Sequence, residues 1–328
     1  MRASAWLALT LCGALAACGH PTQSRSGESR ARERDELSAL WSLYRYTHVR
    51  AGRVVAHDEG GITTSEGQAY AMLRAVWAND RASFEEVWRW TRENLQVRGD
   101  QLLAWKWKDG VLDRNAATDA DQDAALALVL ASRRFRERRW LDDARALLAD
   151  IWDREVLVAG GRPVPTAGNW AVGERFPTIH VAYLAPYAYE VFAEVDPAHP
   201  WKDLVRSSYE ILRFLFVEQR LALPPEIVFL DPRTGRIVLE RPGAAGPAPF
   251  GYDAVPIYWR VALDARWFGR GAEASLRERM LAFPRDAFRA EGRLRERYSA
   301  QGRPLSDLDG LPHLASVEAL ARVEDEAL

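Results

Sequence analysis

Cysteine is almost missing from this chain of 328 residues, which contains only Cys12 and Cys18. Both lie near the N-terminus, so residues 19–328 contain no cysteine. A disulfide framework, which stabilises many small secreted folds, is therefore excluded for that part of the chain. Its stability has to come from a buried apolar core, and a composition that is 48% hydrophobic can supply one.

An excess of charge of either sign is also lacking. Lys and Arg together number 44, Asp and Glu number 46, and the net charge is −2. No basic cluster or nucleic-acid motif occurs, which excludes nucleic acid as an expected partner. The six histidines show no metal-ligand spacing and no cofactor motif is present, so we predict neither a metal nor a cofactor. Tryptophan is abundant instead, with 13 residues, and some of these rings are candidates for a binding surface.

The N-terminus has no apolar run long enough to span a membrane. Residues Ala5 to Ala17 form an apolar stretch of about 13 residues, short of the roughly 20 that a spanning helix needs. Arg2 precedes this stretch, and the sequence L-A-A-C at its end resembles the lipobox of a bacterial lipoprotein. We predict that residues 1–18 are a lipoprotein-type signal peptide and that Cys18 carries a lipid anchor, the only expected membrane contact. The alternative is an ordinary secretory signal, cleaved nearby. The residue after the cysteine is not Asp, which resembles lipoproteins sorted to the outer membrane.

The rest of the chain is mostly helical in pattern. Residues 19–34 are polar and without periodicity, and we predict that they are a flexible tether. No linker interrupts the pattern that follows, so we predict a single domain over residues 35–328. Apolar residues recur at helical spacing in 37–48, 84–95, 140–151, 181–195, 201–216, 253–268, 272–281 and 315–323, besides the two helices described below. About ten helices, some apolar on all sides and others amphipathic, predict an all-α fold with two layers of helices. Small β-hairpins are expected at 156–165 and 227–239.

Acidic side chains crowd the start of one helix. They are Asp113, Asn115, Asp119, Asp121 and Asp123, an acid-and-amide cluster just before the apolar run Ala124 to Ala131. Thr118 and Asp121 have capping-box spacing, which predicts a helix start and a buried helix beyond it. One or two acids there would simply favour the helix dipole, but three within five residues repel one another. A calcium loop is excluded because its Gly position is Ala124 here.

Glu66 is a second acid at a predicted helix start. Ser65 and Gln68 have capping-box spacing, which places Glu66 in the first turn. An acid at that position can be merely a favourable partner of the helix dipole. We expect it to be sequestered close to Asp119 instead, because a neighbouring carboxylate and burial would both raise its pKa toward the value that acid catalysis requires.

Three motifs resemble family 8 of the glycoside hydrolases, in that family's order, over about residues 35 to 270. They are S-E-G-Q-x-Y-x-M around Glu66, A-T-D-A-D with its Ala/Leu helix around Asp119, and Y-D-A followed by W-R around Asp253. The resemblance implies an (α/α)6 double-layered helical barrel and inverting hydrolysis. It implies that Glu66 is the general acid, that Asp253 is the general base and that Asp119 binds and distorts the sugar. For Asp253 the structural alternative is an N-cap.

The implied substrate is a β-1,4-linked polysaccharide such as cellulose, cut internally. Candidate substrate-binding residues are Asp113, Trp105, Trp107, Trp170, Tyr183 and Tyr252. An envelope location resembles that of family members accompanying cellulose or exopolysaccharide export, which makes an export machinery a candidate partner.

The chain also departs from the family pattern. Pro256 stands where the family has Arg, Glu226 lies where P-D-W is common, and His180 opens a segment that matches N-P-S-Y-x-x-P only at Tyr183 and Pro186. A catalytically weak glycan-binding lipoprotein is therefore one alternative. The other is a hydrolase acting on xylan, chitosan or mixed-linkage glucan, because the three acids do not specify the sugar.

Overall fold

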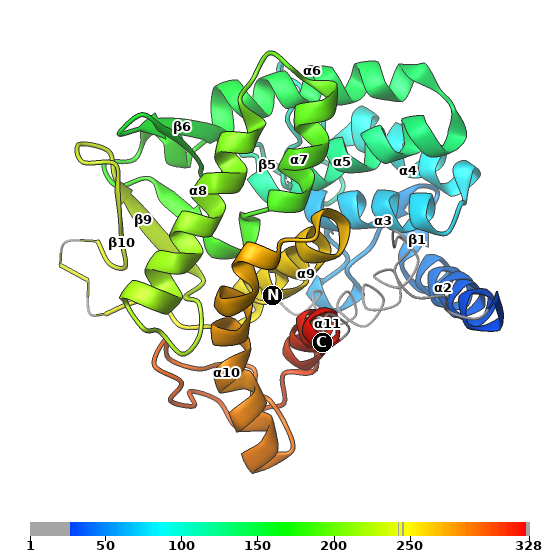
Figure 1. The fold of residues 1–328 in the computed structure, drawn as a ribbon. Helices are drawn as coiled ribbons and strands as arrows, with labels where there is room; N and C mark the ends of the chain where they lie inside the picture. Colours follow the sequence, from blue (N-terminus) through cyan, green and yellow to red (C-terminus); the bar gives the residue numbers. More distant parts are fainter. Residues whose placement is uncertain (1–26, 242, 245, 326–328) are drawn as a thin grey trace.

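A computed structural model of the protein describes residues 27–325 except 242 and 245 (Figure 1). The predicted signal peptide and Cys18 lie outside the described residues. Within them the helices are α2 (Gly27–His48), α3 (Ser65–Trp77), α4 (Arg81–Asn94), α5 (Thr118–Phe135), α6 (Arg138–Glu155), α7 (Pro186–Val195), α8 (Trp201–Arg213), α9 (Pro256–Phe268), α10 (Ala274–Glu291) and α11 (Leu311–Asp325). These are the helices that the periodicity predicts, with different boundaries.

The predicted tether over residues 19–34 is wrong in part. Helix α2 begins inside it, so residues 27–34 are helical instead.

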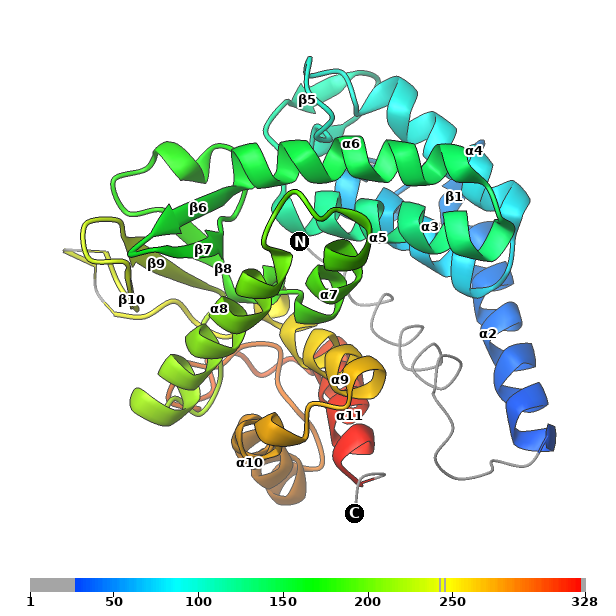
Figure 2. The same ribbon diagram turned by 45° about the horizontal axis from the view of Figure 1, so that its top comes forward.

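The helices form two layers, as predicted (Figure 2). Helices α3, α5, α7, α9 and α11 form the inner layer, in which α3 packs on α5, α5 on α7, α7 on α9 and α9 on α11. Almost every side chain of α3, α5 and α9 is buried, as their all-round apolar sequences require. Helices α4, α6, α8 and α10 lie outside and bury only one face. None of the helices in the described ranges is long and apolar enough to cross a membrane.

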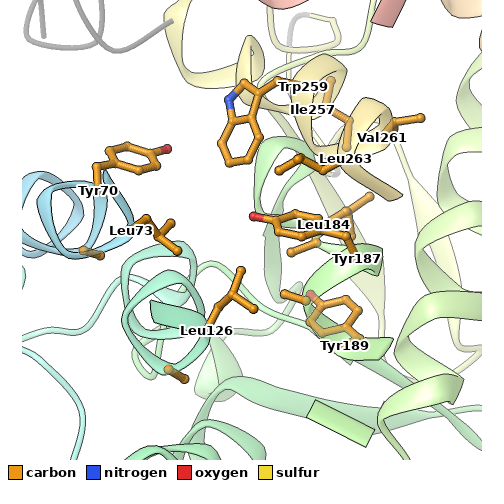
Figure 3. Close-up of a cluster of buried hydrophobic side chains, with 14 of the residues drawn as sticks. Tyr70, Leu73, Leu126, Leu184, Tyr187, Tyr189, Ile257, Trp259, Val261 and Leu263 are labelled. Carbon is orange, nitrogen blue, oxygen red and sulfur yellow. The ribbon is translucent and has the colours of Figure 1, made fainter. Parts of the chain in front are cut away.

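Side chains of four inner helices meet at the centre of the barrel (Figure 3). The ring of Trp259 on α9 contacts Tyr70 of α3 edge-on at 6.3 Å and lies 6.0 Å from Tyr187 of α7. Arg260, fully buried, donates two hydrogen bonds to Asp123 of α5, at 3.0 and 2.7 Å. The Tyr187 hydroxyl donates to the same carboxylate at 3.2 Å. This network joins α5, α7 and α9 directly behind the helix starts.

The predicted capping box at α5 is wrong. The N-cap is Ala117, which has no side chain that could cap, and Thr118 is already helical. Asp121 does not bond back to the helix start. Its Oδ1 accepts a hydrogen bond from the backbone N–H of Leu103 at 2.9 Å. The Asp121 side chain, which the local pattern predicts to cap the helix, therefore makes a tertiary contact with Leu103 instead.

The capping box at α3 is wrong in the same way, although the helix start is close to the predicted one. Thr64 is the N-cap, and its hydroxyl accepts from the N–H of Gly67 at 3.1 Å. The Gln68 side chain instead accepts from the N–H of Val54 at 2.6 Å and donates to Thr91 Oγ1 at 2.8 Å. Gln68 thus fastens the start of α3 to the outer layer.

Short strands occupy the loops at the helix ends. The predicted hairpins are confirmed as β6 (Val156–Ala159) with β7 (Arg162–Pro165), and β9 (Ile227–Asp231) with β10 (Arg236–Val238). The remaining strands are β1 (Val49–Arg50), β2 (Arg53–Val54), β3 (Thr63–Thr64), β4 (Lys106–Trp107), β5 (Val111–Asp113) and β8 (Thr178–His180). Strand β8 pairs with β9, and β3, β4 and β5 form an antiparallel sheet just ahead of α3. These two sheets hold the loops around the helix starts.

Candidate active site

The starts of the inner helices carry the candidate acids. Glu66 lies in the first turn of α3 and Asp119 in the first turn of α5. Asp253 lies in a 3-10 turn, Tyr252–Ala254, that leads into α9. The charges of Asp119 and Asp253 act on Glu66, and that of Asp253 acts on Asp119. Three acids that are far apart in the sequence therefore gather at one end of the barrel.

Glu66 holds its proton at neutral pH. Burial, together with the negative charges of Asp119 and Asp253, raises the pKa of its carboxyl group to about 8. A hydrogen bond with Tyr70, one turn along α3, opposes this shift. The helix dipole also favours the ionised form, but burial and like charge outweigh it. A half-buried carboxyl group that stays protonated near pH 7 is suited to general acid catalysis.

Asp119 lies deeper, with 4% of its surface exposed. Burial raises the pKa of its carboxyl group to about 7, although the nearby Arg260 guanidinium lowers it. Asp123, which is paired with Arg260, and Asp253 act in the raising direction. Asp119 is thus placed between the buried ion pair and the other two acids, where it can hold a sugar hydroxyl group as either donor or acceptor.

Asp253 is half-buried and does not cap its helix. The N-cap of α9 is Val255, without a side-chain hydrogen bond, so the N-cap alternative for Asp253 is wrong. Pro256 occupies the first turn of α9, where its missing N–H needs no partner. Among the ion pairs of the described residues none involves Asp253. Pro256, at the position where the resemblance implies an Arg, therefore leaves the helix intact, and no ion pair in the described part of the chain gives Asp253 a basic partner.

Tyr183 lies among the three acids. Burial raises the pKa of its hydroxyl well above the ordinary value, and the charges of Asp119, Glu66 and Asp253 raise it further. Its ring stacks on His180 at 4.6 Å. Tyr183 lies in a 3-10 turn just ahead of α7. The helix predicted at 181–195 is therefore shorter than expected, since α7 begins at Pro186. A neutral hydroxyl group at the centre of the acids can donate a hydrogen bond to a substrate.

Trp105, Asp113 and Trp107 lie on the sheet beside α3. The carbonyl of Trp105 accepts from the N–H of Ser65 at 3.0 Å, which fixes Trp105 next to Glu66. Asp113 Oδ1 accepts from the N–H of Asn115 at 2.9 Å and so supports the loop before α5. The ring of Trp107 packs edge-on against Trp90 at 5.2 Å, with the Arg53 guanidinium 4.5 Å from its centre. Of these three side chains, that of Trp107 is the one packed into protein on both sides.

Trp170 has the most exposed ring of the candidates, at 42%. A Cβ atom at Gly168 would collide with the carbonyl oxygen of Ala116 and lie 2.6 Å from the Trp170 indole nitrogen, so only glycine allows this approach. Asn169 Oδ1 also accepts from the N–H of Ala116 at 2.7 Å. The exposed indole is thereby fixed over the loop that leads to Asp119.

Tyr252, next to the base candidate, is held by its neighbours. Its hydroxyl donates to Glu296 at 3.3 Å, and its ring meets His313 edge-on at 5.1 Å.

Several residues around the acids were not predicted. Tyr70 lies four residues after Glu66, and that spacing on a helix could have identified it as a neighbour. Arg260 belongs to the W-R of the third motif but shows its role only through the pairing with Asp123. His180 and Glu226 reach Asp253 through the tertiary fold alone. The sequence marks both as departures from the family pattern, but it does not indicate that they lie beside Asp253.

A separate pair of acids is completely buried behind Asp119. Neither oxygen of Glu155, at the end of α6, has a hydrogen-bond partner among the described residues, and Asp121 Oδ2 has none either. Burial raises the pKa of both carboxyl groups well above the ordinary value, and the charge of Asp121 raises that of Glu155 as well. Burial therefore disfavours the charged form of both groups, which lie behind the three acids.

Two hollows on the outer layer are not part of this site. One, of about 630 Å³, lies between α4 and α6, and another, of about 610 Å³, lies between α8 and the β9–β10 hairpin. None of the three acids lines either of them. No group of three His, Cys, Asp or Glu side chains within residues 27–325 is arranged to hold a metal ion.

Sequence comparison decides the family. The model of the glycosyl hydrolases family 8 matches residues 8–294, which is most of the chain. The chain belongs to this family. It is a glycoside hydrolase, and its two layers of helices are those of the (α/α)6 barrel, as predicted.

Several endoglucanases are similar to this chain in sequence. A probable endoglucanase of Novacetimonas hansenii is 33% identical over 236 residues, covering 69% of this chain and 67% of its own length. Endoglucanases of Escherichia coli K12 and Cellulomonas uda are 33% and 28% identical, each over 52% of this chain and 50% of the relative. The chain thus spans about half the length of these two relatives.

Solved structures of family 8 enzymes have the same fold. The endo-β-1,4-glucanase CMCax of Acetobacter xylinum superposes with a TM-score of 0.68 at 25% identity, over 89% of this chain and 98% of its own. An endo-1,4-D-glucanase of Vibrio fischeri gives a TM-score of 0.71 at 22% identity, over 88% of both chains.

Proposed function

We propose that this family 8 enzyme is an inverting endo-β-1,4-glucanase, with Glu66 as general acid, Asp253 as general base and Asp119 bound to the sugar at the point of cleavage. The observation that carries the proposal is that burial and two facing carboxyl groups raise the pKa of Glu66 to about 8. Glu66 keeps its proton at neutral pH and lies within electrostatic reach of a second carboxyl group, that of Asp253, and glycoside hydrolysis uses such a pair.

The reaction then follows from the positions of the acids. Glu66 gives its proton to the glycosidic oxygen as the bond from the anomeric carbon to that oxygen breaks. Asp253 takes a proton from a water molecule, whose oxygen forms the new bond to the anomeric carbon from the opposite face. The product has inverted anomeric configuration, and the proton on Asp253 returns to Glu66 through solvent. Asp119 and Tyr183 hold the hydroxyl groups of the sugar while its ring is distorted.

The proposed substrate is a β-1,4-linked glucan. Support comes from the relatives named endoglucanase, one of which matches two thirds of this chain, and from the exposed Trp170 ring on which a sugar face can stack. Xylan, chitosan and mixed-linkage glucan are the competing substrates, and the same assay on each distinguishes them.

A weakly active glycan-binding protein is the second candidate. It is favoured by one observation, the absence of a basic partner for Asp253 where Pro256 replaces an Arg. This candidate predicts binding of glucan without release of reducing ends.

The test is release of reducing ends from carboxymethylcellulose and barley β-glucan by residues 19–328. We expect release by the wild-type protein, at least 10³-fold less by Glu66→Gln, and an unchanged rate for Glu174→Gln, a half-buried acid outside the site. No release from any β-1,4 polymer, with binding retained in all three proteins, would contradict the hydrolase and support the second candidate.

For location, we propose a lipid anchor at Cys18 that holds the enzyme on the periplasmic side of the outer membrane, near a polysaccharide export machinery. The lipobox-like L-A-A-C sequence supports this. Expression of the full chain with radiolabelled palmitate should label the wild-type protein, and Cys18→Ala should remove both the label and the membrane association. Membrane association that persists in the unlabelled variant would contradict the anchor. Co-purification from solubilised membranes tests the export partner.

A further inference from the structure

A second carboxyl group lies beside the proposed base. Glu226 directly precedes strand β9, and its backbone is bonded on both sides. Its N–H donates to the carbonyl of Pro249 at 2.9 Å, and its own carbonyl accepts from the N–H of Val181 at 3.1 Å. Glu226 is therefore fixed between the segment that leads to Tyr183 and the segment that leads to Asp253.

The Glu226 side chain lies against the chain just ahead of the base. A Cβ atom at Gly251 would collide with Glu226 Oε1, so the carboxyl group lies directly against Gly251, two residues before Asp253. The same Cβ atom would lie 3.7 Å from Cγ of Arg297. Both the Asp253 charge and the Arg297 charge act on Glu226, yet no ion pair between Glu226 and Arg297 is found among the described residues. The carboxyl group thus remains available to a ligand.

The ionisation of Glu226 agrees with this position. Burial and the charge of Asp253, opposed by Arg297, raise the pKa of its carboxyl group to about 7. The protonated and ionised forms both have an oxygen that accepts a hydrogen bond, and the ionised form accepts more strongly.

An attacking water molecule needs a second hydrogen-bond acceptor in addition to the general base. When Asp253 accepts a hydrogen bond from one O–H of the water, the molecule can still rotate about that bond. A second group that accepts from the other O–H fixes the water with its lone pair directed at the anomeric carbon. No ion pair joins a basic side chain to Asp253 in the described chain, and burial lowers the pKa of the neighbouring His180, which disfavours the charged form of this imidazole. Glu226 is the carboxyl group placed to accept the second O–H.

We propose that Glu226 is a positioning residue for the attacking water, which it holds together with Asp253. This role rests on the proposed hydrolytic function. In the reaction the glycosidic bond breaks and its oxygen takes the proton of Glu66, while Asp253 takes one proton of the water. The other proton stays on the new anomeric hydroxyl group, hydrogen-bonded to Glu226. Glu226 accepts a hydrogen bond throughout the step and neither gives nor receives a proton.

The test compares Glu226→Ala and Glu226→Gln with the wild type and with Glu174→Gln as the matched control. Glu226→Ala should lower kcat about 100-fold with KM within about two-fold, because the water is no longer aligned. Glu226→Gln keeps a carbonyl acceptor and should retain most of the activity at pH 5.5. Its deficit relative to wild type should grow to about tenfold by pH 7.5, where the wild-type carboxylate accepts more strongly.

A purely structural Glu226 would give a different pattern. The ratio of wild-type to Glu226→Gln kcat would then stay constant between pH 5.5 and 7.5, and that constancy overturns the proposal. An unchanged kcat in a folded Glu226→Ala also overturns it. If the Ala variant does not fold, the pH-dependent ratio of the Gln variant decides. A wild type that hydrolyses no β-1,4-glucan overturns the proposed function itself, whereas an active wild type with insensitive Glu226 variants overturns only this role.

Discussion

Replacing Glu66, the proposed general acid, should make the protein more stable at alkaline pH. The pKa of Glu66 is 4.5 when unperturbed and about 8 in the folded protein, because burial and the facing carboxyl groups disfavour its charge. Below pH 4.5 Glu66 is protonated in both the folded and the unfolded state, and it does not alter the free energy of unfolding. As the pH rises from 4.5 to about 8, only the unfolded state loses the proton, so stability falls.

The size of the effect follows from the pKa difference of roughly 3.5, since each unit corresponds to about 1.4 kcal/mol. The upper limit is about 5 kcal/mol at pH 8. Asp119 and Asp253 relax when Glu66 ionises, so we expect about 2–4 kcal/mol in practice. Glu66→Gln removes the titrating group, and its gain in stability over wild type should therefore grow from near zero at pH 4.5 to that value at pH 8.

Urea unfolding at pH 4.5, 6 and 8 measures this difference, with Glu174→Gln as the control for losing an acid elsewhere. Urea midpoints should separate progressively for Glu66→Gln and stay close for the control, at equal m-values. A stability difference that is the same at all three pH values would refute the reasoning, because it would show that Glu66 does not keep its proton in the folded state.

Three further predictions concern other parts of the barrel. Arg260→Met should destabilise the protein by about 3–5 kcal/mol in urea unfolding, because Asp123 is left buried without its partner; a loss below about 1 kcal/mol would contradict a stabilising role of the Arg260–Asp123 pair. Glu155→Gln should stabilise the protein increasingly above pH 5, since the raised pKa of Glu155 makes wild-type stability fall as pH rises; thermal melts at pH 5 and 8 measure this, and a pH-independent difference would refute it. Trp170→Ala should raise KM for a soluble β-glucan about tenfold with little change in kcat, and an unchanged KM would exclude the stacking role.

The helices could be predicted from the sequence because their apolar periodicity is strong. The acids at their starts could be predicted too, since Glu66 and Asp119 stand directly before buried helical runs. The capping pattern failed where tertiary contacts competed for the same side chains. Gln68 bonds to Val54 and Asp121 to Leu103, and no local spacing indicates either partner.

The smaller strands were missed for a different reason. Strands of two or three residues, such as β3 (Thr63–Thr64), are too short to show an alternating pattern. The position of Glu226 beside Asp253 was also beyond sequence reasoning, because it depends on backbone bonds to Pro249 and Val181 that join three separate segments. Departures from a family motif, at His180 and Glu226, were nevertheless the places where the structure brought new groups to the site.

The convergence of the inner helix starts has an electrostatic consequence. Each helix start carries the equivalent of roughly half a positive charge, from its unpaired backbone N–H groups. The acids lie where such starts meet, so backbone dipoles supply a diffuse positive potential that no side chain has to provide. A carboxylate at these helix starts is therefore stabilised in part by the backbone, whether or not an arginine side chain lies beside it. This backbone potential comes from the packed barrel itself, so it stays the same whichever side chains occupy the first turns of the helices.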